Sequence, residues 1–539
     1  MIRRPRPSAA GERTWRARLA RAVLGGSALA LVALGVAPVS PSYAADYVPI
    51  SGAGSTWSQV AVDAWRADVR ASGVVVNFAG TGSTDGRSQY IQGTVDFANT
   101  EIPFQNPPEP GQQAEIPDRP YAYIPIVAGG TSFMYNLTVG GQRVRDLRLS
   151  GPTLAKIFTG EITRWSDPAI EKDYGKKLPD IPIIPVVRSD GAGASAQFTK
   201  YMIDQTPDIY CPFIRSKLKL SGSSCPSVSF YPAFGNSKAQ VGSNGVANYV
   251  SASYGAGAIG YVEYAYAKRI DFPVASLLNK GGYFAQPNAG NVAVALTGAT
   301  VDPKTLVQNL KGVYNNPDPR AYPMSSYSYM VAPITTDPPF NADKGKTLST
   351  FVNYFLCAGQ QKADILGYSP LPKNLVEAGF KQVLRIPGHV NPPSIDDCNN
   401  PALNILKSAP QPNKCDKLGA DCTTTNSGGG SGGSTGSGGT TTSGGTTTGG
   451  GTATTGGGTG DALTGGGTAP AAADPLTGAG GTTTTTDGTT LASGTPGQVV
   501  EVTGSRSGQM KATAWIAALM LALTVLVPPF LLRRLQRRS

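Results

Sequence analysis

A long tract of glycine, threonine and serine separates the part of this chain that can fold from the rest. From Thr423 to Gly504 the sequence runs through GGGSGGSTGSGG, TTTGGGTATT and similar repeats, with almost no large apolar side chains. Such a composition cannot bury enough surface to offset chain entropy, so we expect a disordered tether over residues 423–504. Its r.m.s. reach in the Gly-rich regime is roughly 50 Å.

The N-terminus has the pattern of a secretory signal peptide. Seven arginines precede or border the apolar run Val23–Ala37, and small residues follow up to Ala44. We expect residues 1–44 to be cleaved as a signal peptide. A retained membrane helix is the alternative, but the apolar run is short for a span and contains two glycines.

The C-terminus has the pattern of a membrane anchor. Residues 512–532 contain no charged side chain and would extend roughly 31 Å as a helix. Four arginines follow within residues 533–539, which predicts a cytoplasmic basic tail. The expected location is therefore the cell membrane, in a single pass, with the folded domain on the extracellular side.

The formal net charge of +11 does not indicate nucleic-acid binding. The signal segment and the basic tail supply all of it except +1, which is left for residues 46–532. No electrostatic footprint for DNA or RNA remains.

Six cysteines on an exported chain predict disulfides, although six allow fifteen connectivities. Closeness in sequence favours three pairs: Cys211 with Cys225, Cys357 with Cys398, and Cys415 with Cys422. None of them forms a CxxC motif, and the chain has a single histidine, His389. The sequence therefore argues against a structural zinc site and against a histidine-based hydrolytic triad, and we expect no metal, no cofactor and no catalytic residue.

Residues 46–422 alternate between short β-rich runs and helical patterns. Runs such as VVVNFAG, YAYIPIV and AIGYVEY interleave with GPTLAKIFTG and SAQFTKYMI, which predicts an α/β fold. About 375 residues exceed a single core, so we expect two lobes.

Three Gly-rich turns each precede a helix-like run: SGAGSTW from Ser51, GTGSTDG from Gly80 and RSDGAGAS from Arg188. A helix N-terminus presents free N–H groups and partial positive charge, and small residues let an anion approach the backbone. One such turn is commonly only a cap. Three of them, one beside an arginine, indicate an anion-binding site.

These turns, together with VDFANTE, PTLAKIFTGEITRWSDPAI, GAIGYVEYAYA and GQQKADILGYSPLP, resemble the phosphate-binding proteins of bacterial phosphate ABC importers. The resemblance extends over about residues 50–390. It implies the periplasmic-binding-protein type II fold, in which hinge strands join two α/β lobes around a buried anion. The first lobe would be residues 46–124 plus 324–400 and the second residues 125–323, followed by a Cys-containing tail over 401–422.

The resemblance also implies which residues bind the anion. Thr56 and the N–H of Trp57 would donate from the first turn, Ser83 from the second, and Arg188 would supply charge-assisted bonds. Glu101 would accept the proton that hydrogen phosphate carries and sulfate lacks, which would exclude sulfate. The third turn would add its backbone N–H groups, over Ala192, Gly193, Ala194 and Ser195.

Three positions depart from the family pattern. Ala192 and Ala194 stand where the family has hydroxyl side chains, so two donors are missing, although Ser195 offers a hydroxyl early in the helix. Glu101 replaces Asp and reaches about 1.5 Å further. Trp57 replaces Phe. The ligand is therefore expected to be phosphate or a related oxyanion.

The resemblance predicts a monomeric, membrane-anchored solute-binding protein that captures inorganic phosphate, or a related oxyanion, for an ABC permease. The alternative is a surface interaction or sensing protein whose ligand site has degenerated. A secreted hydrolase of phosphate esters lacks the clustered residues that it would need. For four of these residues a purely structural role is the alternative to anion binding. Arg188 could form a surface or hinge ion pair with Asp190, Glu101 could be a solvated carboxylate, and Thr56 and Ser83 could be helix caps.

Overall fold

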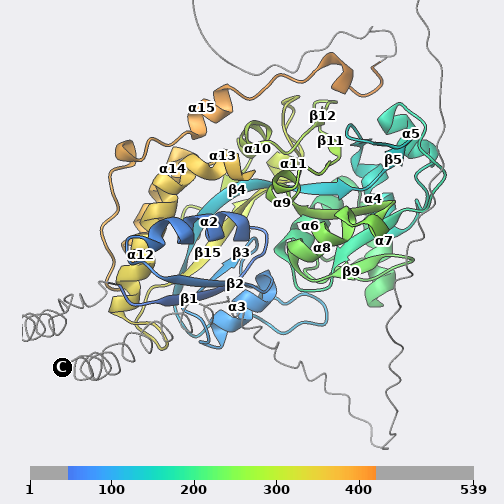
Figure 1. Ribbon diagram of the computed structural model, residues 1–539. Helices are drawn as coiled ribbons and strands as arrows, with labels where there is room; N and C mark the ends of the chain where they lie inside the picture. The colour runs from blue at the N-terminus through green and yellow to red at the C-terminus, as the bar shows by residue number, and fades with distance from the viewer. Residues whose placement is uncertain (1–46, 421–539) are drawn as a thin grey trace, which may run out of the picture. The chain divides into compact units, whose positions relative to one another are not determined.

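The computed structural model describes residues 47–420, which belong to one compact unit (Figure 1). The segments expected to be the signal peptide, the tether, the transmembrane helix and the basic tail lie outside the described residues. Between residues 47 and 420, no helix is both long and apolar enough to cross a membrane.

One sheet of eight strands forms the centre of the structure, in the order β2-β1-β3-β15-β4-β10-β8-β9. Its strands are β1 (Ile50–Gly54), β2 (Val76–Gly80), β3 (Phe97–Thr100), β4 (Tyr121–Tyr135), β8 (Ile184–Arg188), β9 (Lys238–Gln240), β10 (Ala258–Glu263) and β15 (Ser325–Pro333). Shorter strands form small separate sheets: β5 (Thr138–Val139), β6 (Gln142–Arg143), β7 (Arg148–Leu149), β11 (Ser276–Leu278), β12 (Phe284–Ala285), β13 (Thr300–Val301) and β14 (Gln308–Asn309).

Strand β4 connects the two halves of the main sheet. Its residues 121–130 pair antiparallel with β15, and its residues 131–135 pair antiparallel with β10. Fourteen of its fifteen residues are buried, as are all nine of β15, which is typical of strands covered on both faces. Figure 1 shows β4 in cyan, running between the blue strands and the green ones.

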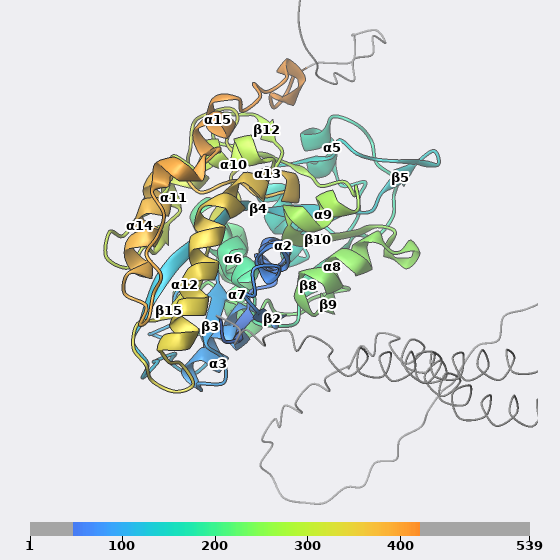
Figure 2. The ribbon, with the colours of Figure 1, turned by 60° about the vertical axis from the view of Figure 1, so that its left-hand side comes forward.

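Helices cover the sheet, and several begin where the sequence places a cap or a Gly-rich turn. They are α2 (Gln59–Arg70), α3 (Ser83–Ile91), α4 (Gly151–Thr159), α5 (Pro168–Tyr174), α6 (Gly193–Gln205), α7 (Pro207–Leu218), α8 (Gly242–Ser251), α9 (Tyr264–Arg269), α10 (Ala289–Leu296), α11 (Lys311–Tyr314), α12 (Ala342–Leu356), α13 (Ala363–Leu366), α14 (Lys373–Val383) and α15 (Ala402–Lys407). Ser150 caps α4, and Asn341 caps α12. In both views α12 and α14 lie side by side (Figures 1 and 2).

The C-terminal part of the described chain crosses from α14 to the region of α10 and β12. Helix α15 packs against α10, and further along Asp416 accepts a hydrogen bond from Arg148 at 2.8 Å. The Leu418 N–H donates to the Gly282 carbonyl at 2.9 Å. Residues 401–420 therefore pack on the folded domain.

Two of the expected disulfides are formed: Cys211–Cys225 and Cys357–Cys398. They close 14 and 41 residues of chain, and a crosslink stabilises mainly by restricting the unfolded state. The third expected pair includes Cys422, which lies outside the described residues, so that pair stays a prediction.

Candidate anion-binding site

The three Gly-rich turns meet because each follows the carboxyl end of a strand. Strand β1 is parallel to β2 and β3, and β8 is parallel to β10 and β9. Within each group the carboxyl ends share an edge, which is where α/β proteins place ligands. The two groups run in opposite directions beside the two ends of β4, so their carboxyl ends point toward each other. Residues 55–58, 81–83 and 101 are called here the β1–β3 turns, and residues 188–195 and 241–243 the β8–β9 turns.

Glu101 lies at the centre of the β1–β3 turns and is buried. Ser55 and Ser328 donate hydrogen bonds from their hydroxyls to Glu101 Oε1, the latter at 2.9 Å. Ser83 donates to Oε2 at 2.7 Å. The reading of Glu101 as a solvated carboxylate is therefore wrong, because hydroxyl donors replace water around it.

The Glu101 carboxylate also lies against the start of α6. A β-carbon built on Gly193, the first residue of α6, would lie only 2.2 Å from Glu101 Oε2. The Gly193 N–H donates to Ser83 Oγ at 3.1 Å, and Gln197 Nε2 donates to the Glu101 carbonyl at 2.8 Å. These contacts join the β1–β3 turns to the β8–β9 turns.

Arg188 lies at the end of β8, with only 2% of its side chain exposed. Its Nε donates to Asp190 Oδ1 at 2.8 Å, and its Nη2 donates to Asp190 Oδ2. The third guanidinium nitrogen, Nη1, lies 3.5 Å from Ser243 Oγ. Arg188 is thus paired with Asp190, as the alternative of a surface or hinge ion pair predicts, but it is buried and not at the surface. One edge of its guanidinium faces the β1–β3 turns through Ser243.

Asp190 is ionised because of this arrangement. Burial raises its pKa, but the hydrogen bonds and positive charge of Arg188, together with the Gly242 N–H at 2.9 Å, outweigh burial and lower the pKa. Thr56 reaches the same region, since the Ser243 N–H donates to Thr56 Oγ1 at 3.0 Å. Thr56 therefore connects the two groups of turns and does not cap α2, whose N-cap is Ser58.

Trp57 is buried under the site and held from three directions. Its indole N–H donates to Thr131 Oγ1 at 3.1 Å, and its carbonyl accepts from the Tyr368 hydroxyl at 2.6 Å. Its backbone N–H donates to Ser55 Oγ at 3.0 Å. The N–H that the resemblance assigns to the anion is thus engaged by Ser55 in this structure.

The third turn is built mainly from its backbone. Ala192 and Ala194 are buried, and the Ala192 N–H donates to the Ser229 carbonyl at 3.0 Å. The Ser195 hydroxyl lies 2.7 Å from the Tyr261 hydroxyl. Burial raises the pKa of Tyr261 to about 12, so its hydroxyl is neutral at physiological pH. Ser195 is therefore held by Tyr261.

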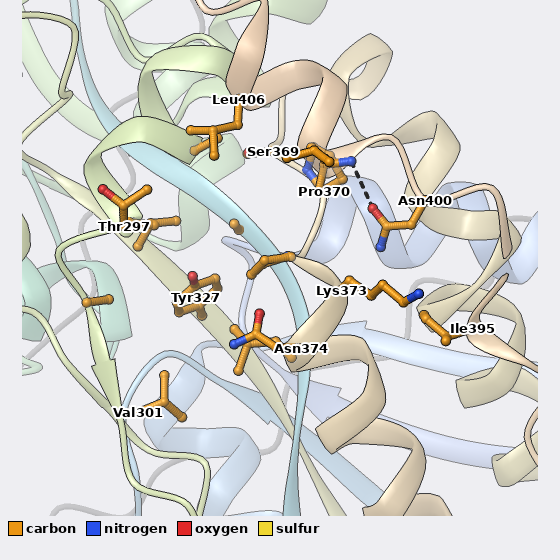
Figure 3. Close-up of a pocket in the computed structure, with 18 of the residues that line it drawn as sticks. Thr297, Val301, Tyr327, Ser369, Pro370, Lys373, Asn374, Ile395, Asn400 and Leu406 are labelled. Atoms are coloured by element: carbon orange, nitrogen blue, oxygen red, sulfur yellow. Dashed lines mark hydrogen bonds between the residues drawn. The ribbon is translucent and has the colours of Figure 1, made fainter.

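Two cavities lie near these elements. One of about 850 Å³ has Tyr327 of β15 and Asn374 of α14 in its wall and contains none of the expected site residues (Figure 3). A second, of about 600 Å³, has Glu101 in its wall together with Gln197, Lys200 and Tyr329. In residues 47–420, no group of His, Cys, Asp and Glu could hold a metal ion.

Sequence reasoning missed three hydroxyl residues of the site: Ser55, Ser243 and Ser328. Ser243 follows Gly242 at the start of α8, which is a fourth Gly-Ser turn before a helix and had the same signal as the other three. Ser55 stands beside Thr56 in the first turn. Ser328 lies inside β15, where no local pattern marks it, and only the fold brings it to Glu101.

Comparisons with known proteins agree with this architecture. Residues 35–358 match the family model described as "PBP superfamily domain". The chain is 31% identical over 336 residues to the phosphate-binding protein PstS of Xylella fastidiosa strain Temecula1, covering 61% of this chain and 83% of that one. It is also 31% identical over 338 residues to PstS of Pasteurella multocida strain Pm70, covering 61% and 88%.

Among solved structures, the phosphate-binding protein from Stenotrophomonas maltophilia matches 66% of this chain and 98% of its own, at 18% identity and a TM-score of 0.47. The two sequence relatives are named as binding proteins and not as enzymes. The domain match and the sequence relatives show that the chain belongs to the PstS phosphate-binding protein family of the PBP superfamily.

Proposed function

We propose that this chain captures inorganic phosphate, or a related oxyanion, between the β1–β3 turns and the β8–β9 turns. The observation that carries the proposal is the convergence at Glu101, where the Ser83 hydroxyl and the first residue of α6 meet a carboxylate. Anions bind at helix N-termini of this kind, where free N–H groups and the helix dipole favour negative charge. Relatives named phosphate-binding proteins support the same ligand.

Each expected site residue has a role in this proposal. Thr56 and Ser83 donate hydroxyl hydrogen bonds, and Trp57 and residues 192–195 offer backbone N–H groups. Arg188 supplies positive charge from the edge that faces Ser243. Glu101 accepts the proton of hydrogen phosphate, which favours this anion over sulfate, because sulfate brings no proton to donate.

The mechanism we propose is closure of two lobes, residues 46–124 plus 324–400 and residues 125–323, on β4 and β15 as hinge strands. The ligand bridges the lobes and shifts an open–closed equilibrium by binding the closed state better. A permease of the ABC type would then recognise the closed monomer. The apolar segment 512–532 and the tether over 423–504 would hold the domain on the extracellular side of the membrane.

A second candidate is a surface interaction or sensing protein whose ligand site has degenerated. Two observations favour it: alanine at positions 192 and 194, and the engagement of the Ser55, Ser83 and Ser328 hydroxyls by Glu101. Both reduce the number of hydrogen-bond donors that are available to a ligand.

Calorimetric titration separates the two candidates. The full chain, purified in detergent and dialysed free of phosphate, is titrated with inorganic phosphate and then with sulfate at two pH values. Phosphate binding in the micromolar range or tighter, without competition from sulfate, supports the capture function. The absence of measurable binding of either anion supports the interaction protein.

A further inference from the structure

We propose that the Glu101 carboxylate is a built-in anion of this site. It takes the position at the start of α6 where an oxyanion would bind, it holds the two groups of turns together without a ligand, and a ligand has to displace it. This inference rests on the proposed function, and it makes residue 101 the determinant of affinity.

The first observation is the set of donors around the carboxylate. Three hydroxyls, those of Ser55, Ser83 and Ser328, donate to its two oxygens. Tetrahedral oxyanions and carboxylates accept the same kind of hydrogen bond. The donors are therefore occupied by a group of the protein that has the chemistry of the ligand.

The second observation is the place of the carboxylate. Helix α6 runs over 13 residues from Gly193, and no side chain of its N-cap residue, Ala192, accepts a hydrogen bond from it. Glu101 Oε2 lies so close to Gly193 that no β-carbon fits between them. The negative charge that the start of a helix favours is thus supplied by Glu101 from another part of the chain.

The third observation is how the charge of Glu101 is compensated. Glu101 takes part in none of the salt bridges formed within residues 47–420, whereas Asp190 is paired with Arg188. The three hydroxyls can donate to another anion one at a time, because no buried cation loses its partner in the exchange. This makes Glu101 displaceable.

The fourth observation is the space beside the carboxylate. Glu101 borders the cavity of about 600 Å³, whose wall also contains Lys200. The Tyr329 hydroxyl in that wall has no hydrogen-bond partner of normal geometry among residues 47–420. If the carboxylate moved away from Gly193, it would enter this cavity, where Lys200 supplies a positive charge and Tyr329 an unsatisfied hydroxyl.

The binding test uses inorganic phosphate and the full chain in three forms: wild type, Glu101→Asp and Glu109→Asp. Glu109 is the matched control, because it is also a buried glutamate that accepts hydrogen bonds, from Ser229 at 2.6 and 2.7 Å. Shortening residue 101 withdraws the competing carboxylate by about one C–C bond. We expect Glu101→Asp to bind phosphate at least about tenfold more tightly than wild type, and Glu109→Asp to bind like wild type.

The closure test needs no ligand. Spin labels on cysteines introduced at Asp85 of α3 and Lys238 of β9, both exposed, report the distance between the two groups of turns by pulsed electron paramagnetic resonance. We expect one short distance for the phosphate-free wild type and a broader, longer distribution for Glu101→Ala.

The outcomes are distinct. The inference is overturned if wild type binds phosphate and Glu101→Asp binds it no more tightly, or if wild type and Glu101→Ala give the same distances without phosphate. The proposed function fails instead if no variant binds phosphate, and in that case the distance measurement still decides whether Glu101 closes the site.

Discussion

Two carboxylates lie among the turns of the site, Glu101 buried and Asp190 partly buried, and the protein compensates their charges in different ways. Asp190 accepts two hydrogen bonds from Arg188 and one from the Gly242 N–H. Among residues 47–420, the Glu101 carboxylate accepts only from the hydroxyls of Ser55, Ser83 and Ser328. One carboxylate is neutralised by a full positive charge, the other by dipoles.

This difference gives the two carboxylates different roles: Asp190 belongs to the scaffold that holds the turns in place, and Glu101 belongs to the binding surface. Removing one member of a buried ion pair leaves an uncompensated charge, which costs about 3–5 kcal/mol, so Asp190 fixes Arg188 in one orientation. Hydroxyls rotate and can serve another acceptor, so the donors around Glu101 are available for exchange. The same few turns therefore contain a fixed ion pair and a carboxylate whose hydrogen-bond donors can be exchanged.

The largest effect is expected for Asp190→Asn. The Arg188 guanidinium, 2% exposed, would keep its charge without a carboxylate partner. We expect the free energy of unfolding to fall by about 3–5 kcal/mol in chemical denaturation. The matched control is Asp180→Asn, which breaks the exposed pair with Arg164 and should leave stability nearly unchanged, because exposed ion pairs contribute little. Equal effects at the two positions would contradict the assignment of Asp190 to the scaffold.

Gly193→Ala should give the next largest effect. Its β-carbon would lie 2.2 Å from Glu101 Oε2, so the carboxylate must leave the start of α6. We expect a loss of about 1–3 kcal/mol in the free energy of unfolding. Gly245→Ala in α8 is the control, because its β-carbon would have no neighbour closer than 3.4 Å and alanine favours the helix. A neutral Gly193→Ala variant would show that Glu101 is not held against α6.

Ser328→Ala removes one donor from Glu101 Oε1 while Ser55 still serves that oxygen. We expect stability to fall by about 1 kcal/mol, measured by denaturation. Ser326→Ala is matched to it, since Ser326 lies two residues away on β15, is buried, and has a hydroxyl without a hydrogen-bond partner among the described residues. That control should be neutral or stabilising, and a comparable loss there would attribute the effect to packing alone.

The smallest effect is expected on mild acidification, because the lowered pKa keeps Asp190 ionised there. The folded pKa of Asp190 is lowered from the ordinary value of 3.8, so its stabilisation is complete above that value and is lost as the pH falls through the folded pKa. The difference in unfolding free energy between wild type and Asp190→Asn should therefore stay constant from neutral pH to about pH 5 and shrink only below about pH 4. A difference that shrinks near neutral pH would contradict this.

Much of the site could be predicted because local patterns and parallel strands determine it. The turns before α3 and α6 were marked by glycine and serine, and they follow the carboxyl ends of β2 and β8. Ser328 could not be predicted, because it belongs to a buried strand and contacts Glu101 across 227 residues of sequence. The position of the Glu101 carboxylate could not be predicted either, because a sequence motif does not specify the distances between atoms in the folded chain.

The most direct test of the account is a crystal structure of the chain with inorganic phosphate. We predict phosphate oxygens within hydrogen-bond distance of Ser83 Oγ and the Gly193 N–H, and a Glu101 carboxylate that has moved away from Gly193 toward the cavity lined by Lys200. Phosphate bound elsewhere, or bound here with Glu101 still against Gly193 and still accepting from Ser83, would contradict it.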